Sequence, residues 1–173
     1  YRKKDTDKEQ RFLDEQEKMS RLSERINKQN YEAIIFFGIG GSQLGPELLQ
    51  QTLCHNSNHK VIFITGSDPT EAEHKIKGLN LEACAFILAS KSFSTIETLK
   101  SFEMVTKKAF MENTYAITTN KSGAKALGIS DKNILLFSKA TGGRFSIWSP
   151  INLLFLIQRG EKAIAEFHLG GQE

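Results

Sequence analysis

The sequence has few cysteines, no long apolar run and no strong charge of either sign. Its 173 residues include 2 cysteines, Cys54 and Cys84, whose separation fits neither a metal site nor a redox pair. We therefore expect two reduced thiols in a cytoplasmic protein. No apolar stretch approaches the roughly 20 residues that a transmembrane helix requires, so we expect no membrane partner.

The charge balance excludes other classes. A net charge of +3 suits small anionic ligands but is too weak to indicate a nucleic-acid partner. The hydrophobic content of 39% and the charged content of 25% are typical of a globular domain with a sizeable core. Because Tyr1 is not an initiator residue, we expect that the true N-terminus is missing.

Residues 1–30 differ from the remainder of the chain. Sixteen of these thirty residues are charged, and none is glycine or proline. Four apolar residues recur at helical spacing, which predicts a charged helix with one apolar stripe packed on the domain or on a neighbour. The stripe consists of Phe12, Met19, Leu22 and Ile26.

After residue 32 short apolar runs alternate with helical stretches. The predicted strands are residues 33–37, 61–65, 84–89, 115–118 and 134–137. The predicted helices between them are residues 44–53, 70–77, 95–111 and 121–127. Most of the strands are almost continuously apolar, as expected of strands buried on both faces. The alternation predicts an α/β fold with a parallel sheet covered on both sides, whose ligands bind at the carboxyl ends of the strands.

A glycine-rich segment, GIGGSQLGP at residues 38–46, follows the first predicted strand. Its glycines let the backbone turn sharply and approach a ligand without a Cβ clash. We expect the amides of Gly41 and Ser42 to open the next helix, where unpaired N–H groups favour an anion. A dinucleotide fingerprint would need glycine in place of Gln43, and a P-loop would need lysine in place of Pro46, so a nucleotide-binding domain is disfavoured.

A second segment, SKSFSTIET at residues 90–98, follows the third predicted strand, and five of its nine residues carry a hydroxyl group. Ser94 and Glu97 have the spacing of a capping box, which predicts that a helix starts there. Hydroxyls and free amides at a helix N-terminus can satisfy a phosphate, which offers many acceptors and no donors. The side chains expected around that phosphate are Ser90, Lys91, Ser92 and Thr95.

The second strand is followed by a segment that needs no ligand. Asp68 as N-cap, Pro69 at the first helical position and Glu71 in the first turn explain it as helix capping alone. After the fifth strand comes GGRFSIWS at residues 142–149, in which two glycines can present Arg144 from a tight turn. A guanidinium suits an oxyanion or phosphate, although an arginine in a surface ion pair would be equally consistent with this segment alone.

Together, the segments at 38–46, 90–98 and 142–149 resemble the phosphoglucose isomerase family in order and spacing. The resemblance implies a three-layer αβα sandwich with a five-stranded parallel sheet, a sugar-isomerase (SIS-type) domain at 31–173 preceded by the helix at 1–30, with the second domain of the enzyme absent. It also implies the reversible aldose–ketose isomerisation of glucose 6-phosphate to fructose 6-phosphate in glycolysis and gluconeogenesis, by a homodimer without metal or other cofactor.

The resemblance further assigns roles to residues. Arg144 matches the arginine that stabilises the enediolate intermediate. The residues that match the sugar-phosphate contacts are Gly41, Ser42, Ser90, Lys91, Ser92, Phe93, Ser94 and Thr95. Thr141, Pro150 and Asn152 depart from the usual family residues, and serines at 92 and 94 replace commoner threonines. These departures bear on fine geometry and not on the family.

The family takes its general-base glutamate, its ring-opening histidine and a further lysine from segments beyond the end of this chain. We therefore expect the chain alone to be inactive. Glu47 and Glu97 are typical of helix caps, and His168 matches no catalytic position of the family. His55 and His59 have the i, i+4 spacing of metal ligands, but the residues between them read as a loop, so we expect no metal.

A second function remains open at this stage. The same domain could be a regulatory module that binds a sugar phosphate without catalysis. Arg144 discriminates between the two, because a sensor does not need a group that stabilises an enediolate.

Overall fold

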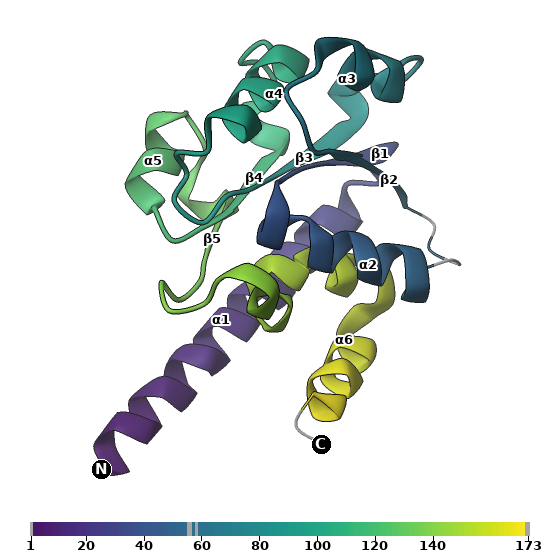
Figure 1. Cartoon of the computed structure of the whole chain (residues 1–173). Coiled ribbons are helices and arrows are strands. Elements are labelled where there is room, and N and C mark those ends of the chain that lie inside the picture. Colours follow the sequence, from purple (N-terminus) through teal and green to yellow (C-terminus); the bar gives the residue numbers. More distant parts are fainter. Residues whose placement is uncertain (1, 55–56, 58, 172–173) are drawn as a thin grey trace.

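Five short strands form one parallel sheet with the order β2-β1-β3-β4-β5 (Figure 1). The computed structural model describes residues 2–54, 57 and 59–171. The strands are β1 (Ala33–Phe37), β2 (Lys60–Ile64), β3 (Cys84–Ala89), β4 (Thr114–Thr118) and β5 (Ile134–Leu136). Each lies within one residue of its predicted bounds. Every residue of β1 and β3 is buried, which explains why these runs are continuously apolar.

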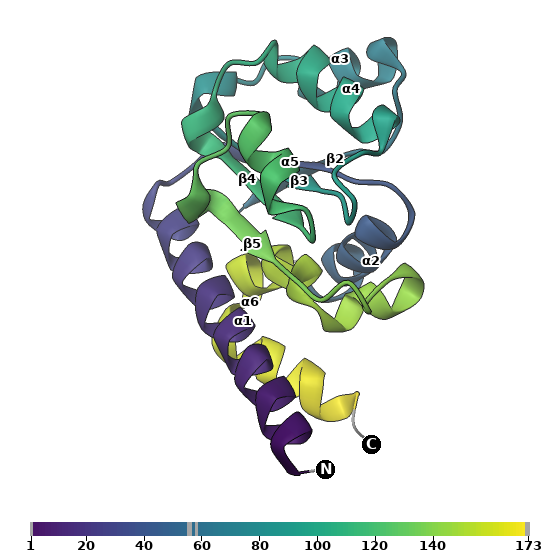
Figure 2. The same cartoon turned by 90° about the vertical axis from the view of Figure 1, so that its left-hand side faces the viewer.

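Helices cover both faces of the sheet, so the predicted three-layer sandwich is confirmed (Figures 1 and 2). One face carries α1 (Arg2–Lys28), α2 (Leu44–Leu53) and α6 (Leu153–Gly170). The other face carries α3 (Pro69–Ile76), α4 (Ile96–Thr106) and α5 (Lys121–Ala126). All the strand pairs are parallel, so the carboxyl ends of the five strands lie at the same end of the sheet.

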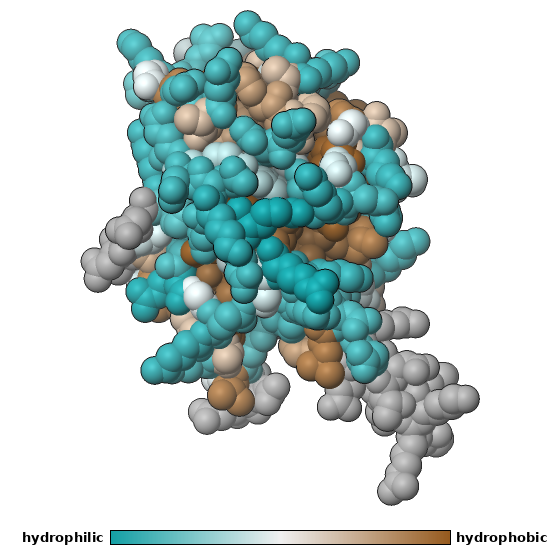
Figure 3. Space-filling view, turned by 180° about the vertical axis from the view of Figure 1, so that it is seen from behind, coloured by the Kyte–Doolittle hydropathy of each residue, from teal (hydrophilic) through white to brown (hydrophobic). Residues whose placement is uncertain are grey.

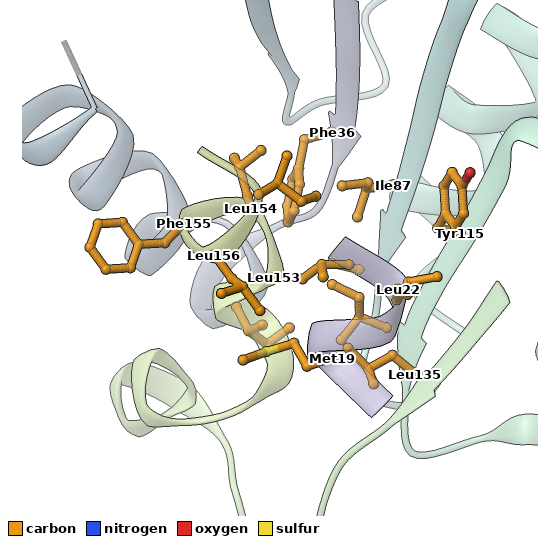
Figure 4. Close-up of a cluster of buried hydrophobic side chains, with 14 of the residues drawn as sticks. Met19, Leu22, Phe36, Ile87, Tyr115, Leu135, Leu153, Leu154, Phe155 and Leu156 are labelled. Carbon is orange, nitrogen blue, oxygen red and sulfur yellow. The ribbon is translucent and has the colours of Figure 1, made fainter. Parts of the chain in front are cut away.

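The apolar stripe of α1 packs against α6 and the sheet. Met19, Leu22 and Ile26 are buried in the same core as Phe36, Ile87 and Leu135 (Figure 4). Phe12, the first member of the predicted stripe, is 45% exposed, because it lies beyond the part of α1 that contacts the sheet. The helix therefore packs on its own domain over its C-terminal half.

Helix α6 was not among the predicted elements. Its first five residues are all buried, so this segment lacks the alternation of apolar and polar faces that identifies a surface helix. Gly160 interrupts the helix with a φ of 78°. The prediction that the fourth helix extends to residue 111 was wrong, because Lys107, Lys108 and Phe110 adopt the left-handed conformation after α4 ends at Thr106.

The surface agrees with a moderately charged chain. The face seen from behind Figure 1 is mainly hydrophilic, with smaller hydrophobic areas between the polar side chains (Figure 3). Cys54 and Cys84 are both buried and free. Within the described residues, no helix is both long enough and apolar enough to cross a bilayer.

Candidate functional site

The glycine-rich and hydroxyl-rich segments follow neighbouring strands. β1 and β3 pair directly, and β1 also pairs with β2 on its other side. The chain therefore passes from β1 to β2 on one side of β1, and then crosses to β3 on the other side, from which β4 and β5 follow. Such a switch in strand order opens a crevice at the carboxyl ends of the two strands, where α/β proteins bind their ligands. Residues 38–43 and 90–95 lie at this crevice.

The glycine-rich segment forms a 3-10 turn, Gly40–Ser42, before α2. The expectation that the amides of Gly41 and Ser42 open the next helix was wrong, since α2 begins at Leu44 and Ser42 N–H donates to the Ile39 carbonyl at 3.3 Å. A Cβ on Gly41 would lie 2.4 Å from the carbonyl oxygen of Gly143. Glycine at position 41 thus lets two distant loops touch through their backbones.

The hydroxyl-rich segment is tied to the end of β4. Thr119 donates to the Lys91 carbonyl through both its backbone N–H, at 3.0 Å, and its hydroxyl, at 2.9 Å. The Thr118 hydroxyl donates to the same carbonyl at 3.1 Å, and the Asn120 side-chain amide donates to the Ser92 carbonyl at 2.9 Å. These bonds hold the 90–95 loop in one conformation before any ligand arrives.

Phe93 anchors the same loop to the hydrophobic core. Its side chain is buried in the core beneath α4 while its backbone has a φ of 54°. A left-handed backbone costs a non-glycine residue about 1–2 kcal/mol. Burial of a phenylalanine side chain contributes about 1.5–3 kcal/mol, so burial offsets the strain. Phe93 therefore positions the loop from the core side and does not line the cavity.

The start of α4 differs from the predicted capping box. Thr95, and not Ser94, occupies the N-cap position, and its hydroxyl makes no capping bond. Instead, the hydroxyls of Thr95 and Ser90 lie 3.2 Å apart, and the Ser94 hydroxyl donates to that of Ser92 at 2.7 Å. The hydroxyls bond to one another because the turn through Phe93 brings them together.

One cavity of about 450 Å³ opens at this edge of the sheet. Five of the predicted site residues line it, namely Gly41, Ser42, Lys91, Ser92 and Thr95. Ser90 is 2% exposed and lies behind Thr95, and Ser94 is exposed outside the lining. The structure thus gathers the glycine of one motif with the hydroxyls and lysine of the other.

Arg144 does not line the cavity, although Gly143 next to it in the chain does. It lies in the 3-10 segment Gly143–Trp148, and its guanidinium carbon is 4.8 Å from the ring centre of Phe145. An exposed cation–π contact of this kind is worth about 0.5–1 kcal/mol. Because its neighbours Gly142, Gly143 and Ser146 do line the cavity, the loop is in place although the guanidinium points elsewhere.

The remaining lining residues were not predicted as ligand contacts, although four of them lie in the segments at 38–46 and 142–149. They are Ile39, Thr119, Lys139, Gly142, Gly143 and Ser146. Thr119 and Lys139 each follow the end of a strand within three residues, so their position along the chain was a usable signal. Neither belongs to a run of similar residues, however, and single polar residues after strands are too common to identify a site.

The other acidic and imidazole side chains lie apart from this lining. Glu47 accepts from the Gln43 side chain, and Glu97 is exposed in the first turn of α4. His168 packs against Phe12, Trp148 and Phe167, and burial lowers its pKa below the usual value.

The two histidines with metal-ligand spacing, at which we expect no metal, lie partly outside the described residues. Burial also lowers the pKa of His59, and His55 lies outside the described residues. In the part of the chain that the structure describes, no three histidine, cysteine, aspartate or glutamate side chains converge on a common point.

Known proteins resemble this chain in both sequence and fold. The family model described as phosphoglucose isomerase matches residues 8–173. The chain belongs to the phosphoglucose isomerase family. A relative from Buchnera aphidicola subsp. Cinara cedri, named glucose-6-phosphate isomerase, is 35% identical over 139 residues. That match covers 75% of this chain and 26% of the relative, so the chain spans about a quarter of the relative's length.

Solved structures confirm the sugar-isomerase fold. A glucose-6-phosphate isomerase from Chlamydia trachomatis superposes with a TM-score of 0.75 at 24% identity, over 88% of this chain and 31% of that one. The sugar isomerase domain of an RpiR transcription factor from Sphaerobacter thermophilus gives a TM-score of 0.55 at 15% identity, over 79% of this chain and 74% of that one. The fold is therefore shared with an enzyme and with a transcription factor.

Proposed function

We propose that this chain forms the phosphate-binding part of a glucose-6-phosphate isomerase, which interconverts glucose 6-phosphate and fructose 6-phosphate. The observation that carries the proposal is the single cavity that Gly41, Ser42, Lys91, Ser92 and Thr95 line together. These residues come from two family motifs that lie about fifty positions apart in the chain. Their hydroxyls and the lysine suit a dianion that offers only acceptors.

The phosphate would be held by the 90–95 loop. Ser92 and Thr95 present hydroxyls at the cavity wall, and Lys91 supplies positive charge. Ser90 would act indirectly, since its hydroxyl bonds to that of Thr95. Because the loop is already hydrogen-bonded to Thr118, Thr119 and Asn120, it would lose little conformational entropy on binding.

Arg144 would act on the sugar end of the substrate. Isomerisation moves a proton between two adjacent carbons through an enediolate, on which negative charge develops. The guanidinium would leave Phe145 and approach that charge, a movement that sacrifices only the weak cation–π contact. The general base would come from outside this chain, as the family resemblance implies. The second domain and the homodimer of the complete enzyme belong to the same proposal.

Calorimetric titration tests the phosphate site. We expect the chain to bind glucose 6-phosphate and inorganic phosphate, and to bind glucose much more weakly. Replacing both Ser92 and Thr95 with alanine should weaken binding of glucose 6-phosphate at least tenfold. Each hydrogen bond to a charged group is worth about 1.5–3 kcal/mol, and about 1.4 kcal/mol corresponds to a tenfold change. The triple variant that also carries Ser90→Ala should bind glucose 6-phosphate no more tightly than the double variant does.

The matched control replaces a serine and a threonine elsewhere. Ser130 and Thr52 are exposed and do not line the cavity, so the double variant Ser130→Ala/Thr52→Ala should bind as the unaltered chain does. An unchanged dissociation constant in the Ser92/Thr95 variant would show that the phosphate does not bind at this loop. A regulatory role would remain if binding persisted while Arg144 proved irrelevant to turnover in the complete enzyme.

A further inference from the structure

Two lysines from different strand ends line the proposed phosphate cavity. Lys91 follows β3, and Lys139 follows β5. The amine of Lys91 lies over Gly142, where an added Cβ would be 3.1 Å from Nζ, and Lys139 precedes this glycine by three residues. The two cationic side chains therefore line the same cavity.

No counter-charge offsets this pair among the described residues. None of the described side chains that line the cavity carries a carboxylate. Within the same described part of the chain, neither lysine forms an ion pair. Two like charges at one cavity repel each other, and a bound anion would relieve that repulsion.

The neighbouring cavity also contains lysines, but two of them are already paired with a carboxylate. That cavity, of about 620 Å³, shares Ser92, Thr119 and Lys139 with the first and adds Lys121 and Lys125. Asp131, however, lies 3.0 Å from the amine of Lys121 and 2.8 Å from that of Lys125. These ion pairs hold the pKa of Asp131 below its usual value, and its carboxylate offsets one of the two lysine charges.

A third cavity offers Lys139 an alternative partner. It contains Glu15, whose pKa is raised above the usual value mainly by burial, which disfavours the charged carboxylate. Lys139 and Glu15 line this cavity together without forming an ion pair in the structure. Glu15 is therefore a suitable control residue for a structural role of Lys139.

We propose that Lys139 is a second cationic ligand of the substrate phosphate, in addition to Lys91. The proposal rests on the proposed function and adds a residue to its site. Lys91 and Lys139 would contact the phosphate from the ends of β3 and β5, and the hydroxyls of Ser92 and Thr95 would donate hydrogen bonds to it. The Thr119 hydroxyl would keep its bond to the Lys91 carbonyl and so hold the loop in place. The site would then favour the dianionic form of a phosphate monoester over the monoanion.

The test measures dissociation constants for glucose 6-phosphate and inorganic phosphate by calorimetry. Lys139→Gln should weaken both about three- to tenfold, as expected for loss of one partly exposed charge. Lys139→Arg should retain most of the affinity. Lys100→Gln makes the same charge change at an exposed position of α4 and should leave both constants unaltered. Glu15→Gln should also leave them unaltered.

A pH series separates charge recognition from a structural effect. The second pKa of a phosphate monoester is about 6, so affinity of the unaltered chain should rise as the pH increases from about 5.5 to 7.5. Lys139→Gln should show a smaller rise. Unaltered affinity in Lys139→Gln, with binding intact in the parent chain, would overturn this inference and leave the proposed function standing. Absence of phosphate binding by the parent chain would overturn both.

Discussion

At the scale of single residues, the contact between Gly41 and Gly143 joins the two halves of the site. A Cβ at position 41 would meet the Gly143 carbonyl at 2.4 Å, closer than real Cβ contacts. The turn after β1 and the arginine loop would have to separate by about half an ångström or more. Since displacements near 1 Å in a site can cost about a hundredfold in rate, the effect on function should be large.

We therefore expect Gly41→Ala to weaken binding of glucose 6-phosphate about tenfold or more, because the cavity wall would open. Calorimetry gives the affinity, and thermal unfolding reports whether the fold persists. Gly66→Ala is the matched control, since a Cβ at that position meets nothing within 4 Å. Equal affinities in the two variants would show that the close backbone approach has no role in binding.

Arg144 leads to a second prediction at this scale. In the complete enzyme that we propose, Arg144→Lys would keep the charge but lose the planar fork of donors. Turnover should fall much more than substrate affinity, because the negative charge that Arg144 meets develops only during reaction. Steady-state kinetics on the variant measure both effects. A raised Michaelis constant with unchanged turnover would instead assign Arg144 to substrate binding.

At the scale of elements, α1 and α6 form a helical layer under the sheet. The C-terminal half of α1 supplies Met19, Leu22 and Ile26 to this layer, and the first turns of α6 supply a continuous apolar segment (Figure 4). Arg25 adds a polar contact, since its guanidinium donates to the Asn133 side chain at 3.0 Å. Helix α1 is thus part of the core and does not merely rest on the surface.

This arrangement predicts a graded effect along the apolar stripe. Met19→Ala should lower the free energy of unfolding by about 2–5 kcal/mol, because the side chain is fully buried and leaves a cavity. Phe12→Ala should cost less than about 1 kcal/mol, since Phe12 is 45% exposed. Urea denaturation followed by circular dichroism measures both values. Equal losses would mean that the first half of the helix packs as tightly as the second.

At the scale of the whole molecule, the chain forms a five-stranded sheet with both faces covered and a cavity whose described lining has no acidic side chain. Its cavity holds hydroxyls and lysines, and the described acidic residues nearest to the motifs, Glu47 and Glu97, lie outside the lining. A phosphate could be held here, but no lining residue is suited to carry a proton between adjacent carbons. We therefore expect that binding and catalysis can be separated experimentally.

We predict that the 173-residue chain alone binds glucose 6-phosphate but does not isomerise it measurably. A positioned base contributes on the order of 10² to 10⁴ in rate, and the loss of ring opening would slow the reaction further. A coupled assay that follows conversion of fructose 6-phosphate, on chain shown to be folded by circular dichroism, provides the measurement. Turnover near that of an intact isomerase would place the base within these residues, and Glu47, Glu97 and His168 would be the first to replace.

The sequence alone determined the strands, the sheet and the family. Strands buried on both faces must be continuously apolar, and that pattern appears in the residues themselves. The three motifs were equally visible, because each needs particular residues next to one another: glycines for a turn, and hydroxyls around a helix start. Local chemistry of this kind can be recognised without knowledge of what lies across the cavity.

Only the tertiary structure decided which side chains share the cavity. Sheet order brings β3, β4 and β5 side by side, and so places Lys91, Thr119 and Lys139 in the lining of one cavity although they are far apart in the chain. The same packing buries Phe93, makes Thr95 the N-cap of α4 and turns Arg144 onto Phe145. Helix α6 escaped detection because its first five residues are all buried, which removes from that segment the periodicity that marks a surface helix. These features depend on contacts between distant segments, which no local pattern of residues encodes.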